Sequence, residues 1–311
     1  MSTALITHQA FLDHDTGPGH PESADRLRAV LAALEDEAFA PLLREIAPAA
    51  TREQLLRVHP ADYVDAILAI RLAPGQLAEI DDSTVISAGS ITAALHAAGA
   101  AIAGVDAVME GWARTAFAAV RPPGHHAGPR EPGGFCLFNN VAVAALHARE
   151  RWGVERVAVV DFDVHHGQGT QAIFENDPYL FYASSHEHPL YPGTGFARER
   201  GIARNILNVP LPPGSDSADF RAAWAETILP ALDDFAPGLL IISAGFDAHR
   251  SDPLAHLALE TEDFSWVTAE LIALADRHCA GRLVSALEGG YDLNALGKSA
   301  AAHVLALMRA A

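Results

Sequence analysis

The sequence predicts a single α/β domain in which a doubly wound parallel sheet lies between layers of helices. Short apolar runs recur along the chain, and each is followed by turn residues and then by a helical pattern. Hydrophobicity within these runs is continuous rather than alternating, which is typical of strands covered on both faces. The chain has no internal repeat, interdomain linker or block of charge. We therefore expect one domain over residues 1–311.

The elements follow from these patterns in order. The clearest strand candidates are residues 115–120, 155–162, 239–246 and 282–290. The helix candidates between and after them are residues 140–151, 169–175, 217–235, 261–278 and 294–309. Asp216 or Ser217 is the expected N-cap of the third helix, and Thr261 that of the fourth.

Residues 91–111 form a further helix candidate that is nearly all apolar and close to the length of a membrane span. Alanine and glycine dominate it, and His96 and Asp106 lie inside it. We therefore predict a closely packed interior helix rather than a membrane span.

Composition excludes several classes of partner. The formal net charge of −18 argues against nucleic acid or an anionic membrane as a partner, because neither attracts an acidic protein. Two cysteines, Cys136 and Cys279, imply no disulfide framework. The N-terminal residues lack the basic start and long apolar segment of a signal peptide, so the predicted location is cytoplasmic.

Polar side chains directly follow each of the four strand candidates. They are Arg121, His125 and His126 after the first, Asp161, Asp163, His165 and His166 after the second, Asp247 after the third, and Glu288 and Tyr291 after the fourth. In open parallel sheets, ligands bind outside the carboxyl ends of the strands. We therefore expect these four sets to converge on one crevice.

Part of this crevice has the composition of a metal site. Asp161, Asp163 and His165 stand at alternate positions, which project from one face of an extended chain. Asp163 and His165 with Asp247 would give three protein ligands and leave coordination positions open, as in a catalytic metal site. Nitrogen and oxygen ligands without thiolate suit Zn²⁺, with Fe²⁺, Co²⁺ and Mn²⁺ as alternatives. The competing interpretation, two aspartates that only cap a helix, is weakened by the coincidence of four polar strand ends.

The remaining polar residues suit acid–base chemistry beside such a metal. One imidazole of the His125–His126 pair can take a proton from water while a neighbouring carboxylate or carbonyl orients the other. Tyr291 follows two glycines, which let the backbone approach closely, and its hydroxyl can donate to a developing oxyanion.

Several blocks resemble the signature motifs of the zinc-dependent histone deacetylase family, nearest to its class II and bacterial deacetylase-like amidohydrolase branch. They are RPPGHHA (121–127), GGFCLFNN (133–140), VVDFDVHHGQGTQ (159–171), SAGFDAHRSDPL (243–254) and EGGY (288–291). GHPESADRL (19–27) and VHPADYV (58–64) resemble further landmarks, so the resemblance covers nearly the whole chain. It implies the arginase/deacetylase fold, with a parallel sheet of about eight strands between helix layers, and an acylated amine, typically N-acetyl-lysine, as substrate.

The resemblance also assigns roles to residues at matching positions. Asp163, His165 and Asp247 match the zinc ligands, and Tyr291 matches the tyrosine that polarises the acyl carbonyl. His125 and His126 match the tandem histidine pair, in which Asp161 would face His125 and Gln168 would face His126. Relatives carry aspartate or asparagine where this chain has Gln168.

The same resemblance implies a substrate tunnel and a second ion. The tunnel residues are Gly134, Phe135, Tyr191 and Leu254, and Tyr191 stands where phenylalanine is more usual. Polyamine-selective relatives can carry glutamate at the position of Leu254. A structural K⁺ is expected near Asp161, Asp163, His165, Ser184 and Ser185, and a rim aspartate near Asp81 or Asp82.

These observations predict metal-dependent hydrolysis of an acylated lysine peptide or of a small acylated amine such as an acetylpolyamine. One rival is a cysteine hydrolase that uses Cys136 and His125. Others are a binuclear ureohydrolase on the same fold and a non-catalytic domain that binds acyl-lysine. A homo-oligomer is compatible with the sequence.

Overall fold

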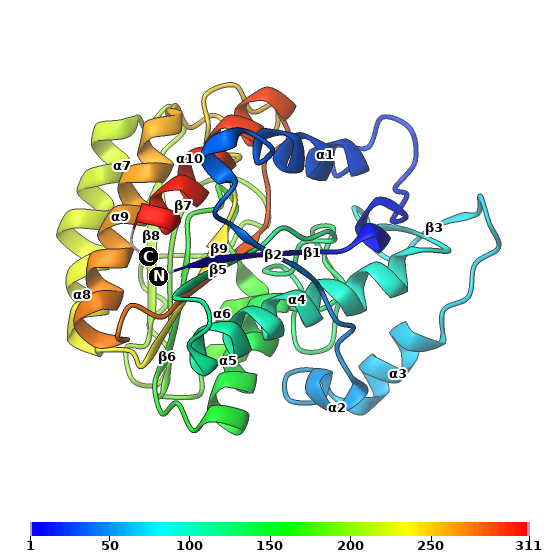
Figure 1. The fold of residues 1–311 in the computed structure, drawn as a ribbon, viewed down its shortest axis with the longest axis horizontal. Coiled ribbons are helices and arrows are strands. Elements are labelled where there is room, and N and C mark those ends of the chain that lie inside the picture. Colours follow the sequence, from blue (N-terminus) through cyan, green and yellow to red (C-terminus); the bar gives the residue numbers. More distant parts are fainter. Residues whose placement is uncertain (1, 310–311) are drawn as a thin grey trace.

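The computed structural model describes residues 2–309 and shows a single α/β domain built on an eight-stranded sheet, as predicted (Figure 1). The strand order is β2-β1-β5-β10-β9-β6-β7-β8, and all neighbours run parallel. The strands are β1 (Thr3–Thr7), β2 (Leu43–Ile46), β5 (Thr115–Ala118), β6 (Val157–Asp161), β7 (Leu180–Glu187), β8 (Ile206–Leu211), β9 (Leu239–Ala244) and β10 (Leu283–Leu287). A separate antiparallel pair joins β3 (Leu77–Glu79) and β4 (Val85–Ser87).

Helices cover both faces of the sheet (Figure 1). One layer contains α1 (Ala24–Ala33), α7 (Ser217–Ala223), α8 (Leu229–Phe235), α9 (Thr261–His278) and α10 (Leu293–Arg309). The other contains α2 (Arg52–Leu55), α3 (Ala61–Ala69), α4 (Ser90–Glu110), α5 (Asn140–Trp152) and α6 (Gln168–Phe174). Short 3-10 turns occur at Gln9–Leu12 and Glu37–Phe39.

The four predicted strands are confirmed and are neighbours at the centre of the sheet, in the order β5-β10-β9-β6. The continuous apolar runs are explained by burial, because every residue of these four strands is buried. The carboxyl ends of the four strands therefore lie side by side at one edge of the sheet.

Two details of the predicted helices need correction. Helical structure does cover residues 217–235, but a π-helical turn at Trp224–Ile228 separates α7 from α8, just before Pro230, which has no N–H for the regular helical ladder. Asp216 caps α7 through the N–H groups of Ala218 and Asp219, as expected. The N-cap of α9 is Glu260 rather than Thr261, which is the first helical residue.

The apolar helix α4 is an interior helix, as predicted. It is long and apolar enough to cross a membrane, but it packs against β1, β5 and α5 and buries most of its length there. Its polar residues have protein partners: His96 bonds to the Ala47 carbonyl, and Asp106 accepts hydrogen bonds from His147 and Trp152. The apolar composition of α4 is thus explained by the core.

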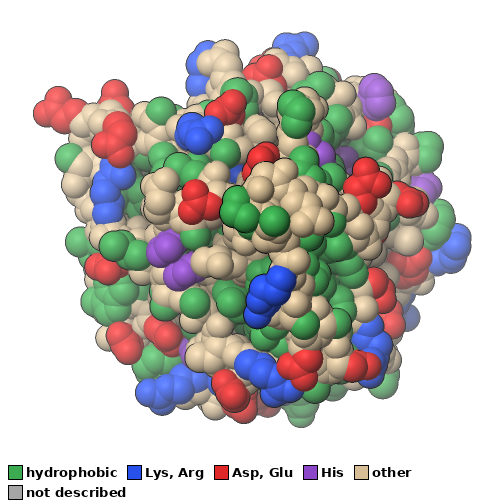
Figure 2. Space-filling view, turned by 90° about the vertical axis from the view of Figure 1, so that its right-hand side faces the viewer, with side chains coloured by type: hydrophobic (Ala, Val, Ile, Leu, Met, Phe, Trp, Pro, Cys, Tyr) green, Lys and Arg blue, Asp and Glu red, His purple; other side chains and the backbone are tan. Residues whose placement is uncertain are grey.

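Charged groups on the face shown in Figure 2 are mixed in sign. Basic side chains are interspersed with aspartate and glutamate side chains and with apolar ones. This face has no basic patch of the kind that attracts nucleic acid, in keeping with the net charge of −18.

Candidate active site

Asp163, His165 and Asp247 come together in a buried cluster just beyond the ends of β6 and β9. One potential ligand atom from each lies within 4.8 Å of the other two. The Nδ1 atom of His165 is 3.1 Å from Asp163 Oδ1 and 3.1 Å from Asp247 Oδ2. Backbone donors fix both carboxylates, because the His165 N–H bonds to Asp163 and the Val164 N–H bonds to Asp247, each at 2.9 Å.

The donor set fits a divalent cation. Asp163 and Asp247 are at most 1% exposed, and two adjacent buried carboxylates require positive charge nearby. Burial and the charge of Asp163 raise the pKa of Asp247 above its usual value. Although burial lowers the pKa of His165, the two carboxylates raise it to about 10. A bound cation, with His165 as a neutral ligand, would supply the positive charge that these two carboxylates need.

Glycines leave room for these carboxylates. A Cβ atom on Gly245 would lie 2.1 Å from Asp163 Oδ2, and one on Gly289 would lie 2.0 Å from Asp247 Oδ2. Any side chain at either position would displace a carboxylate of the cluster. This requirement accounts for the glycine in SAGFD and for the first glycine in EGGY.

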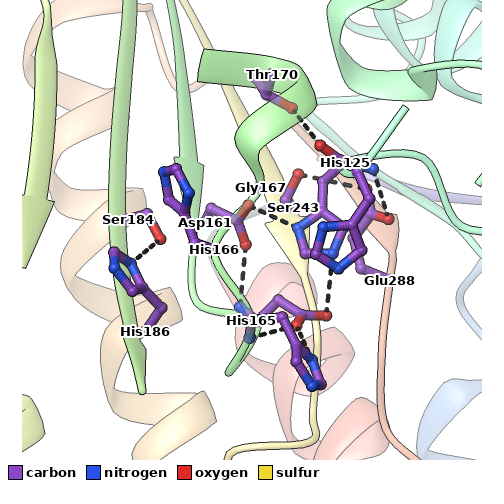
Figure 3. A network of polar contacts seen from close by, with 12 residues as sticks. His125, Asp161, His165, His166, Gly167, Thr170, Ser184, His186, Ser243 and Glu288 are labelled. Atoms are coloured by element: carbon purple, nitrogen blue, oxygen red, sulfur yellow. Dashed lines mark hydrogen bonds and ion pairs between the residues drawn. The ribbon is translucent and has the colours of Figure 1, made fainter. Parts of the chain in front are cut away.

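His125 pairs with a buried carboxylate. Its Nδ1 lies 2.9 Å from Asp161 Oδ2 (Figure 3). The same carboxylate oxygen accepts the Tyr182 hydroxyl at 3.0 Å. Glu288 accepts the N–H groups of Gly124 and His125 and so fixes the histidine loop. Burial lowers the pKa of His125, but the charges of Asp163 and Asp161 outweigh it and raise this pKa to about 10.

His126 has a neutral partner. Its Nδ1 lies 2.7 Å from Gln168 Oε1. An amide oxygen can only accept, so Nδ1 carries the proton and Nε2 is left with a free lone pair. Burial and the positive charges of His125 and His165 hold the pKa of His126 well below its usual value. The two adjacent imidazoles therefore favour opposite charge states.

A cavity of about 240 Å³ leads from the surface to these groups. Its walls are Ser83, His126, Gly134, Phe135, His165, Leu190, Tyr191, Leu254 and Tyr291. All four predicted tunnel residues line it, and Ser83 and Leu190 were not predicted. The Tyr191 ring packs edge-on against the His126 ring at 5.0 Å, and the Phe135 ring against Tyr291 at 6.0 Å.

The backbone conformation and the close approach of His126 require glycine at position 134. The φ of Gly134 is +53°, and a Cβ atom would lie 2.2 Å from the His126 ring. A side chain here would collide with the imidazole and would also strain the backbone.

Tyr291 lines the tunnel and packs over a buried arginine that was not predicted. The Arg26 guanidinium is 4.8 Å from the centre of the Tyr291 ring and donates to the carbonyls of Gly290 and Glu288. Burial raises the pKa of Tyr291 well above its usual value, so the hydroxyl stays protonated and can donate. Arg26 lies within the GHPESADRL block, but nothing in sequence spacing links it to residue 291.

The other predicted positions lie away from this centre. The His166 side chain lies apart from His165 (Figure 3). Its ring nitrogens bond to Thr194 and Gln171. The hydroxyls of Ser184 and Ser185 contact His186 and Trp224. Any contribution of these two serines to a K⁺ site would therefore come from backbone oxygens, and the K⁺ stays a prediction.

The two rim candidates do not line the cavity. Asp81 accepts the N–H groups of Ser83 and Thr84, and Asp82 is exposed. Asp81 therefore organises the loop that brings Ser83 to the tunnel, and neither aspartate contributes to the cavity wall itself.

Cys136 does not have the environment of a nucleophile. Its side chain is fully buried, and its Sγ donates to the Gly134 carbonyl at 3.3 Å. Burial raises the pKa of the thiol well above its usual value, whereas a nucleophilic cysteine needs a lowered one. This observation argues against a cysteine hydrolase. Among residues 2–309, Asp163, His165 and Asp247 are the one cluster of metal-ligating side chains found, which argues against a binuclear site.

Comparison with known proteins agrees with this geometry. The profile of the histone deacetylase domain matches residues 20–307. The chain is 42% identical over 280 residues to the histone deacetylase-like amidohydrolase of Pseudomonas aeruginosa, covering 88% of this chain and 73% of that protein. It is 39% identical over 299 residues to a probable deacetylase of Archaeoglobus fulgidus, and the match covers 94% of this chain and 82% of that protein.

A plant relative and a solved structure extend the comparison. Histone deacetylase 14 of Arabidopsis thaliana, which is chloroplastic by name, is 39% identical to this chain. The match covers 98% of this chain and 76% of that protein. The crystal structure of the HDA15 HD domain superimposes with a TM-score of 0.91 at 36% identity, covering 99% of this chain and 90% of that one. The chain belongs to the histone deacetylase domain family.

Proposed function

We propose that this protein is a zinc-dependent deacetylase that hydrolyses the acyl amide of N-acetyl-lysine or of a related acylated amine. The observation that carries this proposal is the tunnel, whose lining reaches one metal-ligating cluster, a tyrosine and two adjacent histidines, of which one pairs with a carboxylate and the other with a neutral amide. Membership of the histone deacetylase domain family supports it.

Each group at the end of the tunnel has a separate task. A zinc ion held by Asp163, His165 and Asp247 would polarise the acyl carbonyl and make water more acidic. His126, neutral with a free Nε2, accepts a proton from the attacking water. Tyr291 donates its hydroxyl proton in a hydrogen bond to the carbonyl oxygen as negative charge develops there.

The last step of the reaction is proton transfer to the leaving amine. Addition of water forms the new C–O bond and leaves negative charge on the carbonyl oxygen. The C–N bond then breaks as the C=O double bond reforms, and an imidazolium of the histidine pair protonates the departing amine. The products are a carboxylate and a free amine. Asp161 keeps the His125 ring in place through its 2.9 Å hydrogen bond.

The tunnel walls suit an extended aliphatic stem. Phe135, Tyr191, Leu190 and Leu254 present mainly apolar surface, which favours methylene groups over a second charge. A lysine side chain carries its acyl amide at the end of such a stem. Nucleic acid and membrane partners stay excluded in this proposal because of the net charge of −18, and a cytoplasmic location stays a prediction.

The direct experiment is a substrate panel with the zinc-loaded protein. Acyl-lysine peptides, acetylpolyamines and small acetamides are incubated with it, and released carboxylate and amine are both quantified. Release of both products in equal amounts supports hydrolysis. Stoichiometric binding of acyl-lysine peptide without any release would instead support the non-catalytic alternative.

Within this panel, we expect acetyl-lysine peptide or a neutral acyl amide to be preferred over N-acetylspermidine. Leu254 gives the tunnel wall no charge to attract a second ammonium group. Comparison of kcat/KM for the two substrates at equal zinc occupancy measures the preference. Leu254→Glu is the matched variant and should shift it toward N-acetylspermidine. A clear wild-type preference for N-acetylspermidine would contradict this specificity.

A further prediction concerns the partner of the general base. Gln168→Asp should move the acidic limb of the kcat/KM profile to higher pH. The new carboxylate would favour the imidazolium form and raise the pKa of His126, which burial and the charge of His125 hold low in the wild type. The base is lost as pH falls through that pKa, so a higher pKa removes activity at a higher pH. Gln168→Asn is the control. If the acidic limb of the kcat/KM profile does not move in Gln168→Asp at full zinc occupancy, residue 168 is not the partner of His126.

A further inference from the structure

The backbone that carries Tyr291 has little conformational restraint of its own. Gly289 and Gly290 precede the tyrosine, and Gly290 has a φ of +120°, a conformation that side-chain-bearing residues rarely adopt. Glycine pairs lose more conformational freedom on folding than any other sequence. The position of the Tyr291 hydroxyl therefore depends on contacts made by this segment with the surrounding chain.

Three of those contacts lie before the tyrosine. The Gly289 N–H donates to Asp163 Oδ2 at 2.8 Å, and the Gly289 carbonyl accepts the Phe246 N–H at 3.0 Å. The Gly290 carbonyl accepts Arg26 Nε at 2.6 Å. They fix the two glycines, and the Arg26 contact also holds one side of the planar peptide unit that joins Gly290 to Tyr291.

Asp252 supplies the contact at the tyrosine itself. Its Oδ2 accepts the Tyr291 N–H at 2.7 Å, and its Oδ1 accepts the Leu254 N–H at 3.0 Å. Asp252 is only 7% exposed, so its two hydrogen bonds are shielded from competing water. Tyr291 and Leu254 both line the tunnel. One buried carboxylate thus ties two parts of the tunnel wall together.

We propose that Asp252 is a positioning residue that sets the placement of the Tyr291 hydroxyl, and with it the adjoining Leu254 wall, for the hydrolysis proposed above. This inference rests on that proposed function. Asp252 lies in the loop between β9 and α9, and its side chain is not part of the cavity wall. It therefore acts through the backbone of residue 291 and not by contact with the substrate.

The size of the expected effect follows from what Tyr291 contributes. An oxyanion donor that is moved by about 1 Å loses much of its benefit, and such displacements can lower a rate by about 100-fold. Through this route, loss of Asp252 cannot cost more than loss of the Tyr291 hydroxyl itself. Leu254 adds a smaller effect on KM, because its side chain contacts the stem of the substrate and not the reacting carbonyl.

The test is a double-mutant cycle with acetyl-lysine peptide and zinc-loaded protein. Asp252→Ala should lower kcat by about 10-fold or more, while zinc content is unchanged and KM changes less than kcat. Asp252→Asn retains one acceptor oxygen and should recover part of the rate. In a Tyr291→Phe background, Asp252→Ala should have almost no further effect on kcat, because the hydroxyl that it positions is already absent.

Asp216→Ala is the control for a purely structural loss. Asp216 also accepts two backbone N–H groups, at the start of α7, and does not line the tunnel. Its loss should cost about 1 kcal/mol of stability, the usual cost of removing an N-cap, and leave kcat unchanged. Equal rate losses from Asp252→Ala in the wild-type and Tyr291→Phe backgrounds would overturn the inference, as would an unchanged kcat in Asp252→Ala. If Asp252→Ala does not fold, Asp252→Asn takes its place in the same cycle.

A second readout separates this inference from the proposed function. Hydrogen exchange of the Tyr291 amide should be faster in Asp252→Ala than in the wild type, whether or not the protein turns over a substrate. A wild-type protein without hydrolysis of any acyl amide would refute the proposed function. A wild-type protein that hydrolyses the peptide, with unchanged Tyr291 amide exchange in Asp252→Ala, would refute only the role of Asp252.

Discussion

Tyr291→Phe is expected to fold, to retain its metal and to turn over acetyl-lysine peptide about 100-fold or more slowly than the wild type. The substitution keeps the ring above the Arg26 guanidinium and removes only the hydroxyl. Burial raises the pKa of that hydroxyl, so it stays protonated, and the residue lines the tunnel. The loss should fall mainly on kcat, because the hydrogen bond strengthens as charge develops on the carbonyl oxygen.

Steady-state kinetics with metal content measured on the same sample checks this expectation. Tyr179→Phe removes a hydroxyl from a tyrosine that is 44% exposed and outside the cavity, so it should behave as the wild type. Near wild-type turnover in Tyr291→Phe would remove the tyrosine from the mechanism.

Replacement of any one metal ligand should lower turnover even more than loss of the Tyr291 hydroxyl does. Asp163→Ala, His165→Ala and Asp247→Ala should each lose both bound metal and measurable turnover. In the proposed site three ligands would hold the ion, and loss of one would leave too few donors to retain it through dialysis. Metal analysis of the dialysed proteins is the measurement.

His166→Ala is the matched control for the ligand variants. His166 is the sequence neighbour of His165 and is also buried, but its ring nitrogens bond to Thr194 and Gln171. It should keep its metal even if it is less stable. Full metal content in all three ligand variants would show that the ligand set is wrong.

The sequence was most informative where a continuous apolar run is followed directly by polar residues at the end of a strand. The four runs that predicted strands are β5, β6, β9 and β10, and their burial on both faces explains why they stand out. Polar residues directly after such runs had to meet at one edge of the sheet. For this reason the amino-acid sequence alone was enough to predict that Asp163, His165 and Asp247 lie together.

Other strands were missed because their patterns are weaker. All four residues of β2 are exposed, as fits a strand at the edge of the sheet. The apolar start of β7 passes into Ser184 and Ser185, which interrupts the hydrophobic run although both residues are buried. A buried polar residue in a strand cannot be distinguished from a turn residue by composition alone.

The residues that support Tyr291 could not be predicted from sequence either. Arg26 bonds to the carbonyl of Gly290, which is 264 positions away, and Asp252 bonds to the N–H of Tyr291, which is 39 positions away. Both contacts involve backbone atoms of Gly290 and Tyr291, which leave no signature in the side chains there. Only the path of the chain in three dimensions identifies such partners.

The most direct test of the account is a zinc titration of acetate release from N-acetyl-lysine peptide. Metal is first removed by a chelator, and Zn²⁺ is then added in measured amounts. The account predicts that metal-free protein is inactive and that activity rises in proportion to added zinc until about one ion per chain is bound. Full activity in the metal-free protein, or no acetate release from the peptide at full zinc occupancy, would contradict it.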